Sequence, residues 1–258
     1  MKLTRIILII ISLLLWIHFL VSSVILTPVL LLLWLITRPF DPQLRLLHKF
    51  SCFWGAQYIW VNPLWSLEIQ HKEHFNEKLP HIMVSNHQSL VDILVIYSLF
   101  RHFKWTSKAE NFRLPFVGWV LYFNNSIPVY RGAHDAYLKF SARALKELKA
   151  GSSIVMFPEG TRSRTGRIGK FKDGAFMLAQ EAKVPVLPMV IQGTSAAVPK
   201  KGWIIRGRQK IRLKILEPVP YENFRDLTVK DVSEMVYERI KRELEEGRDE
   251  NGGVRSDG

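Results

Sequence analysis

The hydrophobic pattern divides the chain into a long apolar start and a body in which apolar and polar segments alternate. Residues 6–36 contain no charged side chain and consist mostly of Leu, Ile and Val. As one helix this run would measure about 46 Å, which exceeds the bilayer hydrocarbon core of about 30 Å. Pro28 lacks a backbone N–H, so we expect a kink or a break there. The pattern predicts a helical membrane-associating segment over residues 1–60.

The second part of that segment mixes basic and aromatic residues. Trp54, Tyr58, Trp60 and Trp65 occur among lysines and arginines within residues 38–69. Rings with one polar atom and basic side chains with apolar stems suit the headgroup layer of a membrane. The same pattern is typical of a helix that packs aromatic side chains into a protein core, and the sequence leaves both interpretations open.

The remaining body alternates short segments rich in β-branched residues with stretches of helical periodicity. Apolar positions recur every three or four residues within 134–150 and 229–240, which indicates helices with one buried face. The alternation predicts an α/β fold over residues 61–247, with a mostly parallel central sheet flanked by helices. Residues 248–258 are polar and predict a disordered tail. The predicted strands are 81–85, 126–130, 153–157, 184–191 and 210–216.

Polar residues follow the first of these strands in the stretch "SNHQSLVDI", which contains His87 and Asp92. If Ser89 is the N-cap of the next helix, Asp92 falls in its first turn and its carboxylate can reach the imidazole. A carboxylate that orients a neutral imidazole gives a general base near physiological pH. The alternative is a capping box, in which Ser89 and Asp92 serve only backbone N–H groups. The spacing is compatible with both.

A second polar stretch, "FPEGTRSR", follows the strand at 153–157. A glycine turn at Gly160 can direct successive backbone N–H groups at an anion, and Arg162 can add a bidentate contact to a phosphate. Five basic residues and no acidic residue occur from Arg162 to Lys172. The alternative is a solvated basic loop that touches anionic lipid.

Composition narrows the classes of partner. The formal net charge of +13 indicates an anionic partner, which can be a nucleic acid, a membrane surface or a phosphorylated substrate. The basic residues lack an interleaved aromatic platform, which argues against nucleic acid. Cys52 is the only cysteine, so internal disulfides and cysteine metal clusters are excluded. His71 and His74 are interpreted as solvated surface, and no metal site is expected.

Taken together, the motifs resemble those of a known family. N-H-x4-D, followed about seventy residues later by F-P-E-G-T-R-S and preceded by an apolar N-terminus, resembles the glycerolipid acyltransferases. The resemblance is closest to the 1-acyl-sn-glycerol-3-phosphate acyltransferases. Two further blocks match more weakly: "SIPVYRG", which ends in Arg131 and Gly132, and "VPVLPMVI", which contains Pro185 and Pro188. The stretch "SKAENFRLPFVGW" is also similar to the family, with Lys108 at its basic position. The block "IPVYR" departs from the family's usual form, which is closer to F-I-D-R.

The resemblance implies transfer of a fatty acyl group from acyl-CoA or acyl-carrier protein to the sn-2 hydroxyl of 1-acylglycerol 3-phosphate. The product would be phosphatidic acid, an intermediate of phospholipid biosynthesis. In this reaction His87 would deprotonate the hydroxyl and Asp92 would orient His87. Backbone donors at the following helix N-terminus would stabilise the oxyanion. No metal or cofactor is implied.

The resemblance also implies roles for the surrounding residues and for the membrane. Glu159 and Asn86 would organise the site, and the apolar segment would hold the enzyme at the inner or cytoplasmic membrane, with the catalytic domain on the cytoplasmic side and facing an anionic bilayer surface. The acceptor phosphate would contact Arg162, Gly160, Thr161, Lys108 and Arg131.

Three other functions remain open from the residues. The acceptor can be another lysophospholipid or glycerol 3-phosphate. A lysophospholipid hydrolase would use the same His–Asp pair to activate water. A non-catalytic membrane-binding protein would account for the charge and the apolar segment, but it gives His87 no purpose.

Overall fold

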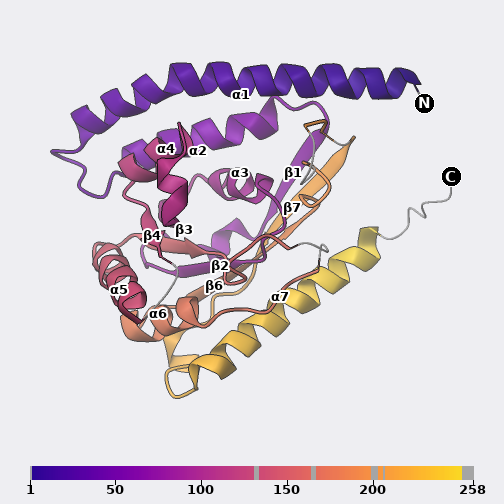
Figure 1. Cartoon of the computed structure of the whole chain (residues 1–258). Coiled ribbons are helices and arrows are strands. Elements are labelled where there is room, and N and C mark those ends of the chain that lie inside the picture. The colour runs from indigo at the N-terminus through magenta and orange to yellow at the C-terminus, as the bar shows by residue number, and fades with distance from the viewer. Residues whose placement is uncertain (1, 131–133, 164–166, 199–202, 206, 252–258) are drawn as a thin grey trace.

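The computed structural model describes residues 2–130, 134–163, 167–198, 203–205 and 207–251 (Figure 1). The described helices are α1 (Lys2–Thr37), α2 (Arg45–Trp60), α3 (Val91–Tyr97), α4 (Val117–Phe123), α5 (His134–Lys149), α6 (Gly174–Ala182) and α7 (Val229–Asn251), with short 3-10 turns η1 (Lys72–His74), η2 (Ala109–Arg113) and η3 (Tyr221–Asn223). The strands are β1 (Trp65–Gln70), β2 (Ile82–Ser85), β3 (Phe103–Lys108), β4 (Ile127–Val129), β5 (Ser153–Met156), β6 (Val186–Gln192) and β7 (Gln209–Ile215).

The strands form one sheet in the order β1-β7-β6-β2-β5-β3-β4. β2 lies inside it, where Ile82 pairs in parallel with Ile154 of β5 and with Val186 of β6. β6 and β7 pair antiparallel, and β1 pairs parallel with β7, so β1 and β7 run opposite to the other five strands. The predicted α/β class with a mostly parallel sheet is confirmed. The connection after β2 crosses one face of the sheet, and the connection after β5 crosses the other. Ligands of such sheets bind at the carboxyl ends of the two strands between which the connections diverge.

The predicted strands match the structure, but two strands were not predicted. β1 lies in the stretch interpreted as amphipathic and membrane-adjacent, and β3 contains the buried charged residue Lys104, which interrupts the apolar pattern of a strand. At the C-terminus the predicted tail begins too early, because α7 continues to Asn251. Residues 252–258 lie outside the described residues.

Alternate side chains of the strands point into two apolar layers. Ile82 and Val84 of β2 belong to the layer beneath α5, α6 and α7, whereas Met83 belongs to the layer shared with α2 and α3. Burial on both faces accounts for the nearly continuous apolar sequence of the central strands. Figure 1 shows α5, α6 and α7 on one side of the sheet, and α2, α3 and then α1 on the other.

The predicted break at Pro28 is wrong, because α1 runs through Pro28 as a single helix of 36 residues. Proline removes one intrahelical hydrogen bond, and the surrounding run of strongly apolar residues continues the helix on both sides. The hydroxyl of Thr27 donates to the Ser23 carbonyl oxygen at 2.6 Å, one turn before the proline.

Polar interruptions of the apolar run bind the rest of the protein. The hydroxyl of Ser12 accepts the backbone N–H of Ile205 at 2.8 Å, and the Ser22 and Tyr58 hydroxyls are 2.8 Å apart. His18 Nε2 lies 2.9 Å from Gln57 Oε1. These contacts join α1 to α2 and to residues 203–205, so both halves of α1 lie against the body.

α2 packs against both parts of the molecule. Leu47 and Trp54 contact the apolar cluster beside α1, whereas Cys52 and Ile59 belong to the layer against the sheet. This agrees with an aromatic core helix, the second of the two interpretations of residues 38–69. The predicted division at residue 60 stays a prediction.

A buried basic cluster lies where α2 meets the start of β3. Lys104 Nζ donates to the carbonyl oxygens of Gln43 and Asn124, at 2.8 and 3.1 Å. The rings of His48 and His102 lie 5.3 Å apart beside it. Burial, reinforced by the charge on Lys104, lowers the pKa of His48 to about 3. Burial and the neighbouring His48 lower the pKa of His102 to about 2. Both imidazoles are therefore neutral in the folded protein at neutral pH.

We expect the free energy of unfolding to fall as the pH drops from about 7 to about 5. The unfolded chain binds a proton at position 48 near pH 6.5, whereas the folded pKa is depressed, so stability is present above the unfolded value and is lost below it. The loss is on the order of 2 kcal/mol for His48, which is 2% exposed. Urea unfolding in neutral detergent, followed by tryptophan fluorescence, measures it.

The variant His48→Gln separates this effect from other titrations. Its unfolding free energy should depend less on pH than that of the wild type, and the matched change at the exposed His71, His71→Gln, should leave the dependence intact. Equal pH dependence in His48→Gln and wild type would contradict the assignment to His48.

Candidate active site

His87 lies at the carboxyl edge of the sheet, two residues after β2, and Asp92 lies in the first turn of α3. His87 Nδ1 is 2.8 Å from Asp92 Oδ2. The side chain of His87 is 14% exposed, whereas that of Asp92 is fully buried. Within the described residues His87 Nε2 has no hydrogen-bond partner, and this atom is accessible to solvent. A proton on Nδ1, held by Asp92, leaves the Nε2 lone pair available to a substrate.

The Asp92 carboxylate also closes the turn before α3. Its Oδ2 accepts the backbone N–H groups of Gln88 and Ser89, at 2.6 and 2.8 Å, and its Oδ1 accepts the Thr194 hydroxyl at 2.5 Å. One carboxylate therefore both caps the turn before α3 and orients His87. The spacing had left these two roles as alternatives. The helix begins at Val91 with Leu90 as the N-cap, so Ser89 is not the N-cap, although its hydroxyl accepts the Val91 N–H at 3.3 Å.

The expected oxyanion donors at this helix start are already used. The N–H groups of Gln88 and Ser89 bind Asp92, and that of Val91 binds the Ser89 hydroxyl. A buried carboxylate is stable only with such donors, so these N–H groups are not available to a substrate. The structure therefore does not support the expectation that these three groups stabilise an oxyanion.

Glu159 joins the His87 turn to the basic loop. Its Oε1 accepts the His87 N–H at 2.7 Å and its Oε2 accepts the Gly169 N–H at 2.8 Å. Burial raises the pKa of the Glu159 carboxyl, and these two donors act in the opposite direction. A Cβ at Gly169 would lie 2.9 Å from Oε2, so a larger residue would push this carboxylate from its present position. Glu159 thus organises backbone, as predicted, and in the described structure its partners are not arginines.

The loop that follows Glu159 turns back over His87. Gly160 has a φ of +69°, which favours glycine, and the Ser163 N–H donates to the His87 carbonyl oxygen at 2.8 Å. Thr161 and Arg162, between them, are exposed. Lys172 lies against the turn, since its Nζ would be 2.9 Å from a Cβ at Gly160. A glycine turn with two cations beside the base is suited to a phosphate.

The structure gives contacts for one of the other predicted site residues, only a position for the second, and neither for the third. Asn86 is fully buried and bridges β2 and β6, because its amide donates to the Ile191 carbonyl oxygen at 2.8 Å and accepts the Ile191 N–H at 2.9 Å. Lys108 ends β3 at the same edge of the sheet as His87. Its contact with the phosphate stays a prediction. Arg131 lies outside the described residues.

Three residues at this site were not predicted. Thr194 follows β6 and contacts Asp92, and its position directly after a strand end is the signal that was available. Lys172 belongs to the basic run but was not singled out. The Phe157 ring stacks on the His87 ring, with centroids 4.0 Å apart, which fixes the imidazole plane. Only the folded chain brings these residues to His87.

One group of side chains has the composition of a metal site. Ligand atoms of His71, Glu73 and His74 lie within 4.8 Å of one another. His74 already uses both ring nitrogens, Nδ1 with the Ile215 carbonyl oxygen at 2.9 Å and Nε2 with Glu217 at 3.0 Å. The group follows β1, which runs opposite to β2, so it lies at the other edge of the sheet from His87. It is not part of the His87 site.

Comparison with known proteins gives consistent matches. A family model described as "Acyltransferase" matches residues 66–192. A chloroplastic 1-acyl-sn-glycerol-3-phosphate acyltransferase of Arabidopsis thaliana is 35% identical over 182 residues, which are 70% of this chain and 51% of the relative. The 1-acyl-sn-glycerol-3-phosphate acyltransferase of Saccharomyces cerevisiae is 33% identical over 174 residues, 66% of this chain and 57% of the relative. The chain thus spans a little over half the length of these curated relatives.

A solved structure matches over nearly the whole chain. It is the crystal structure of the 1-acyl-sn-glycerophosphate (LPA) acyltransferase PlsC from Thermotoga maritima. The TM-score is 0.76, the sequence identity is 26%, and the match covers 99% of both chains. The likeness therefore includes the N-terminal helices as well as the sheet.

We expect Thr194→Val to lower kcat by about tenfold to a hundredfold, because a hydrogen bond to a charged group contributes roughly 1.5–3 kcal/mol. Valine has nearly the same shape but cannot donate to Asp92 Oδ1, so this buried oxygen loses its hydroxyl donor and the carboxylate holds His87 less firmly. Steady-state kinetics should show kcat reduced with little change in KM. Thr194→Ser, which keeps the hydroxyl, should retain most of the rate. A rate that stays near the wild-type value in Thr194→Val and falls in Thr194→Ser would show that Thr194 acts through packing alone.

Proposed function

The chain belongs to the acyltransferase family through residues 66–192, and from this membership we propose that it acylates the sn-2 hydroxyl of 1-acylglycerol 3-phosphate to give phosphatidic acid. The donor is an acyl thioester, acyl-CoA or acyl-carrier protein. The observation that carries the proposal is the His87–Asp92 pair, with Nε2 directed away from Asp92 and a glycine turn bearing Arg162 folded over the same residue. A base and an anion site at one strand end suit a substrate with a hydroxyl and a phosphate.

The proposed reaction is direct transfer in a ternary complex. His87 Nε2 takes the proton of the acceptor hydroxyl as its oxygen attacks the thioester carbonyl carbon. Asp92 holds Nδ1–H and stabilises the imidazolium. This attack forms the ester C–O bond and gives a tetrahedral intermediate. Its collapse re-forms the carbonyl and breaks the C–S bond, and the thiolate leaves with the proton from His87. The chain's own side chains suffice for these steps, so the proposal includes no metal or cofactor.

The acceptor phosphate is assigned to the turn at Gly160. Thr161 and Arg162 are exposed there, and Lys172 lies against the glycine. We include Lys108, because β3 ends at the same edge of the sheet, and Arg131 from the family resemblance. Glu159 keeps this loop at His87 through its two backbone contacts.

The apolar helix gives the enzyme access to its lipid substrate. α1 is long and apolar enough to cross a membrane, and exposed apolar side chains follow it from Ile6 to Ile36. An upright crossing would break the contacts that Ser12 and Ser22 make with the body. We therefore propose that α1 lies along one face of the bilayer, which places the domain at the headgroups. The cytoplasmic side of the inner or cytoplasmic membrane is proposed because acyl thioesters are made in the cytoplasm.

Loss of the base should abolish transfer. We expect His87→Ala to lower the rate at least hundredfold, because general base catalysis typically contributes 10² to 10⁴. Purified protein in neutral detergent is given a labelled acyl thioester with 1-acylglycerol 3-phosphate, glycerol 3-phosphate or lysophosphatidylcholine, and the labelled products are separated. The matched change His71→Ala, at the opposite edge of the sheet, should leave the rate intact.

Each acceptor tests a different part of this proposal. Label in phosphatidic acid supports it, whereas label in another lipid would replace the acceptor. Label found only as free fatty acid would identify a hydrolase. Transfer that survives His87→Ala would exclude His87 as the base.

Removal of the proposed phosphate contact should affect the acceptor alone. We expect Arg162→Ala to raise the KM for 1-acylglycerol 3-phosphate by about tenfold or more and to leave the KM for the thioester nearly unchanged. Arg225→Ala, an exposed arginine in the loop before α7, serves as the matched control. A larger change in the thioester KM would show that Arg162 binds the donor.

A further inference from the structure

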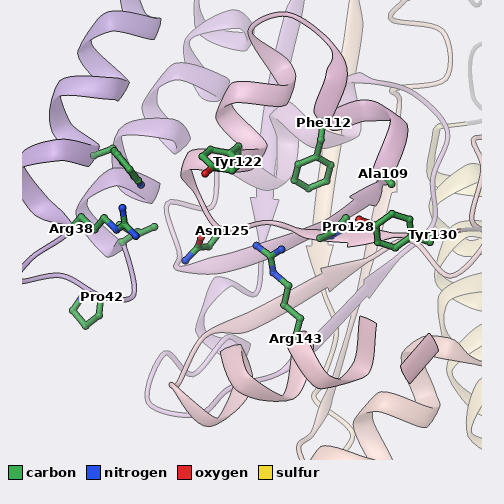
Figure 2. Close-up of a pocket in the computed structure, with 11 residues that line it drawn as sticks. Arg38, Pro42, Ala109, Phe112, Tyr122, Asn125, Pro128, Tyr130 and Arg143 are labelled. Carbon is green, nitrogen blue, oxygen red and sulfur yellow. The ribbon is translucent and has the colours of Figure 1, made fainter. Parts of the chain in front are cut away.

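A pocket of about 590 Å³ lies at the end of the sheet formed by β4. The end of α1, the α1–α2 loop, α4, β4 and α5 all contribute to its walls, so the pocket joins the membrane helix to the acyltransferase domain (Figure 2). In the sheet order, β5 and β3 lie between β2, which positions His87, and β4. Neighbouring strands are about 4.8 Å apart, which separates the two strands by about 14 Å. The pocket therefore lies to one side of His87, and it borders the proposed acceptor contacts, since Ala109 and Tyr130 in its lining adjoin Lys108 and Arg131.

The charge of the pocket is positive. Arg38, at the end of α1, and Arg143, on α5, both line it, and none of its lining residues is acidic. Among the described residues neither arginine forms an ion pair. Arg38 lies over the Trp34 ring, 4.7 Å from its centroid, and Figure 2 shows the Arg143 guanidinium reaching in between Asn125 and Pro128. Two guanidinium groups from different elements, without an ion-pair partner among the described residues, favour an anion such as phosphate.

The rest of the lining is largely aromatic and continues to an apolar outer surface. Phe112, Tyr122 and Tyr130 line the pocket, and the two tyrosines are 65% and 54% exposed. Phe40, beside Arg38 in the sequence, is 72% exposed. Leu35 and Ile36, which precede Arg38 in α1, are exposed as well. Tyrosines and tryptophans with nearby arginines are typical of the membrane–water interface. A ligand of this pocket therefore approaches from the bilayer.

We propose that this pocket binds the phosphate of an anionic glycerophospholipid of the bilayer, as a second lipid site apart from the acceptor site. The inference rests on the proposed function only in that α1 lies on a membrane. A phosphate held by Arg38 and Arg143 connects the membrane helix to α5. Anionic lipid thereby fixes the β4 edge of the domain against the bilayer.

Direct binding tests the proposal without any acyl donor. The full chain in neutral detergent is titrated with dioctanoyl phosphatidylglycerol, dioctanoyl phosphatidylcholine or inorganic phosphate, and tryptophan fluorescence reports binding. All titrations are repeated with Arg162→Gln, which removes the proposed acceptor contact. We expect phosphatidylglycerol to bind at least tenfold more tightly than the other two probes, in the wild type and in Arg162→Gln alike.

Substitution of the two pocket arginines tests whether the lipid binds in this pocket. Arg38→Gln and Arg143→Gln should each weaken phosphatidylglycerol binding about tenfold, and Arg225→Gln, the matched exposed control, should not. Equal affinity for phosphatidylcholine, or no effect of either pocket substitution, would overturn the proposal. Inorganic phosphate that binds as tightly as the lipid would identify a free-anion site instead. Loss of binding in Arg162→Gln would place the lipid in the acceptor site.

Failure of this proposal is distinguishable from failure of the proposed function. The binding titration needs no turnover, so it gives the same answer whether or not His87→Ala abolishes transfer. Conversely, label in phosphatidic acid is measured whether or not the pocket binds lipid.

Discussion

The Asp92 carboxylate is fully buried beneath the surface that carries His87, and a buried charge is tolerated only when hydrogen-bond donors surround it. The donors come from three places: the His87 ring, the backbone of the following turn, and the Thr194 hydroxyl beyond β6. Their convergence fixes the end of β2 relative to the end of β6, and Asn86 repeats this connection through both backbone groups of Ile191. The position of the base is therefore set by the register of the sheet.

Glu159 extends the same arrangement to the phosphate loop. One carboxylate, between the His87 and Gly169 N–H groups, sets the distance from the base to the basic loop. This accounts for an acid next to a proposed anion site, since its charge is used by backbone donors and does not face the ligand. The two acidic residues of the site thus act on geometry, and the exposed cations remain available for the proposed phosphate contact.

Much of the site could be predicted from the sequence because its motifs are local. His87 and Asp92 are five positions apart, and Gly160 and Arg162 belong to a single turn. Thr194 is about a hundred positions from Asp92, so no local pattern connects them. In the fold, β3 was missed because the buried Lys104 imitates an exposed position, and its burial depends on carbonyl oxygens of Gln43 and Asn124. The helix α1 continues through Pro28 because its long apolar run outweighs one lost hydrogen bond. Local sequence rules do not predict which of these two effects is larger.

The contacts of α1 also determine when the protein can finish folding during synthesis. Ser12 and Trp16 bind the backbone of Ile205 and Trp203, nearly 200 positions later, and β1 pairs only with β7. Chains grow at about 5–20 residues per second. The first helix therefore leaves the ribosome many seconds before these partners exist, and in that interval it can form its contacts with α2 but not those with residues 203–205. If α1 attaches to a membrane as proposed, lipid meets its exposed apolar side chains before the sheet is complete, so the bilayer takes part in folding before β7 exists.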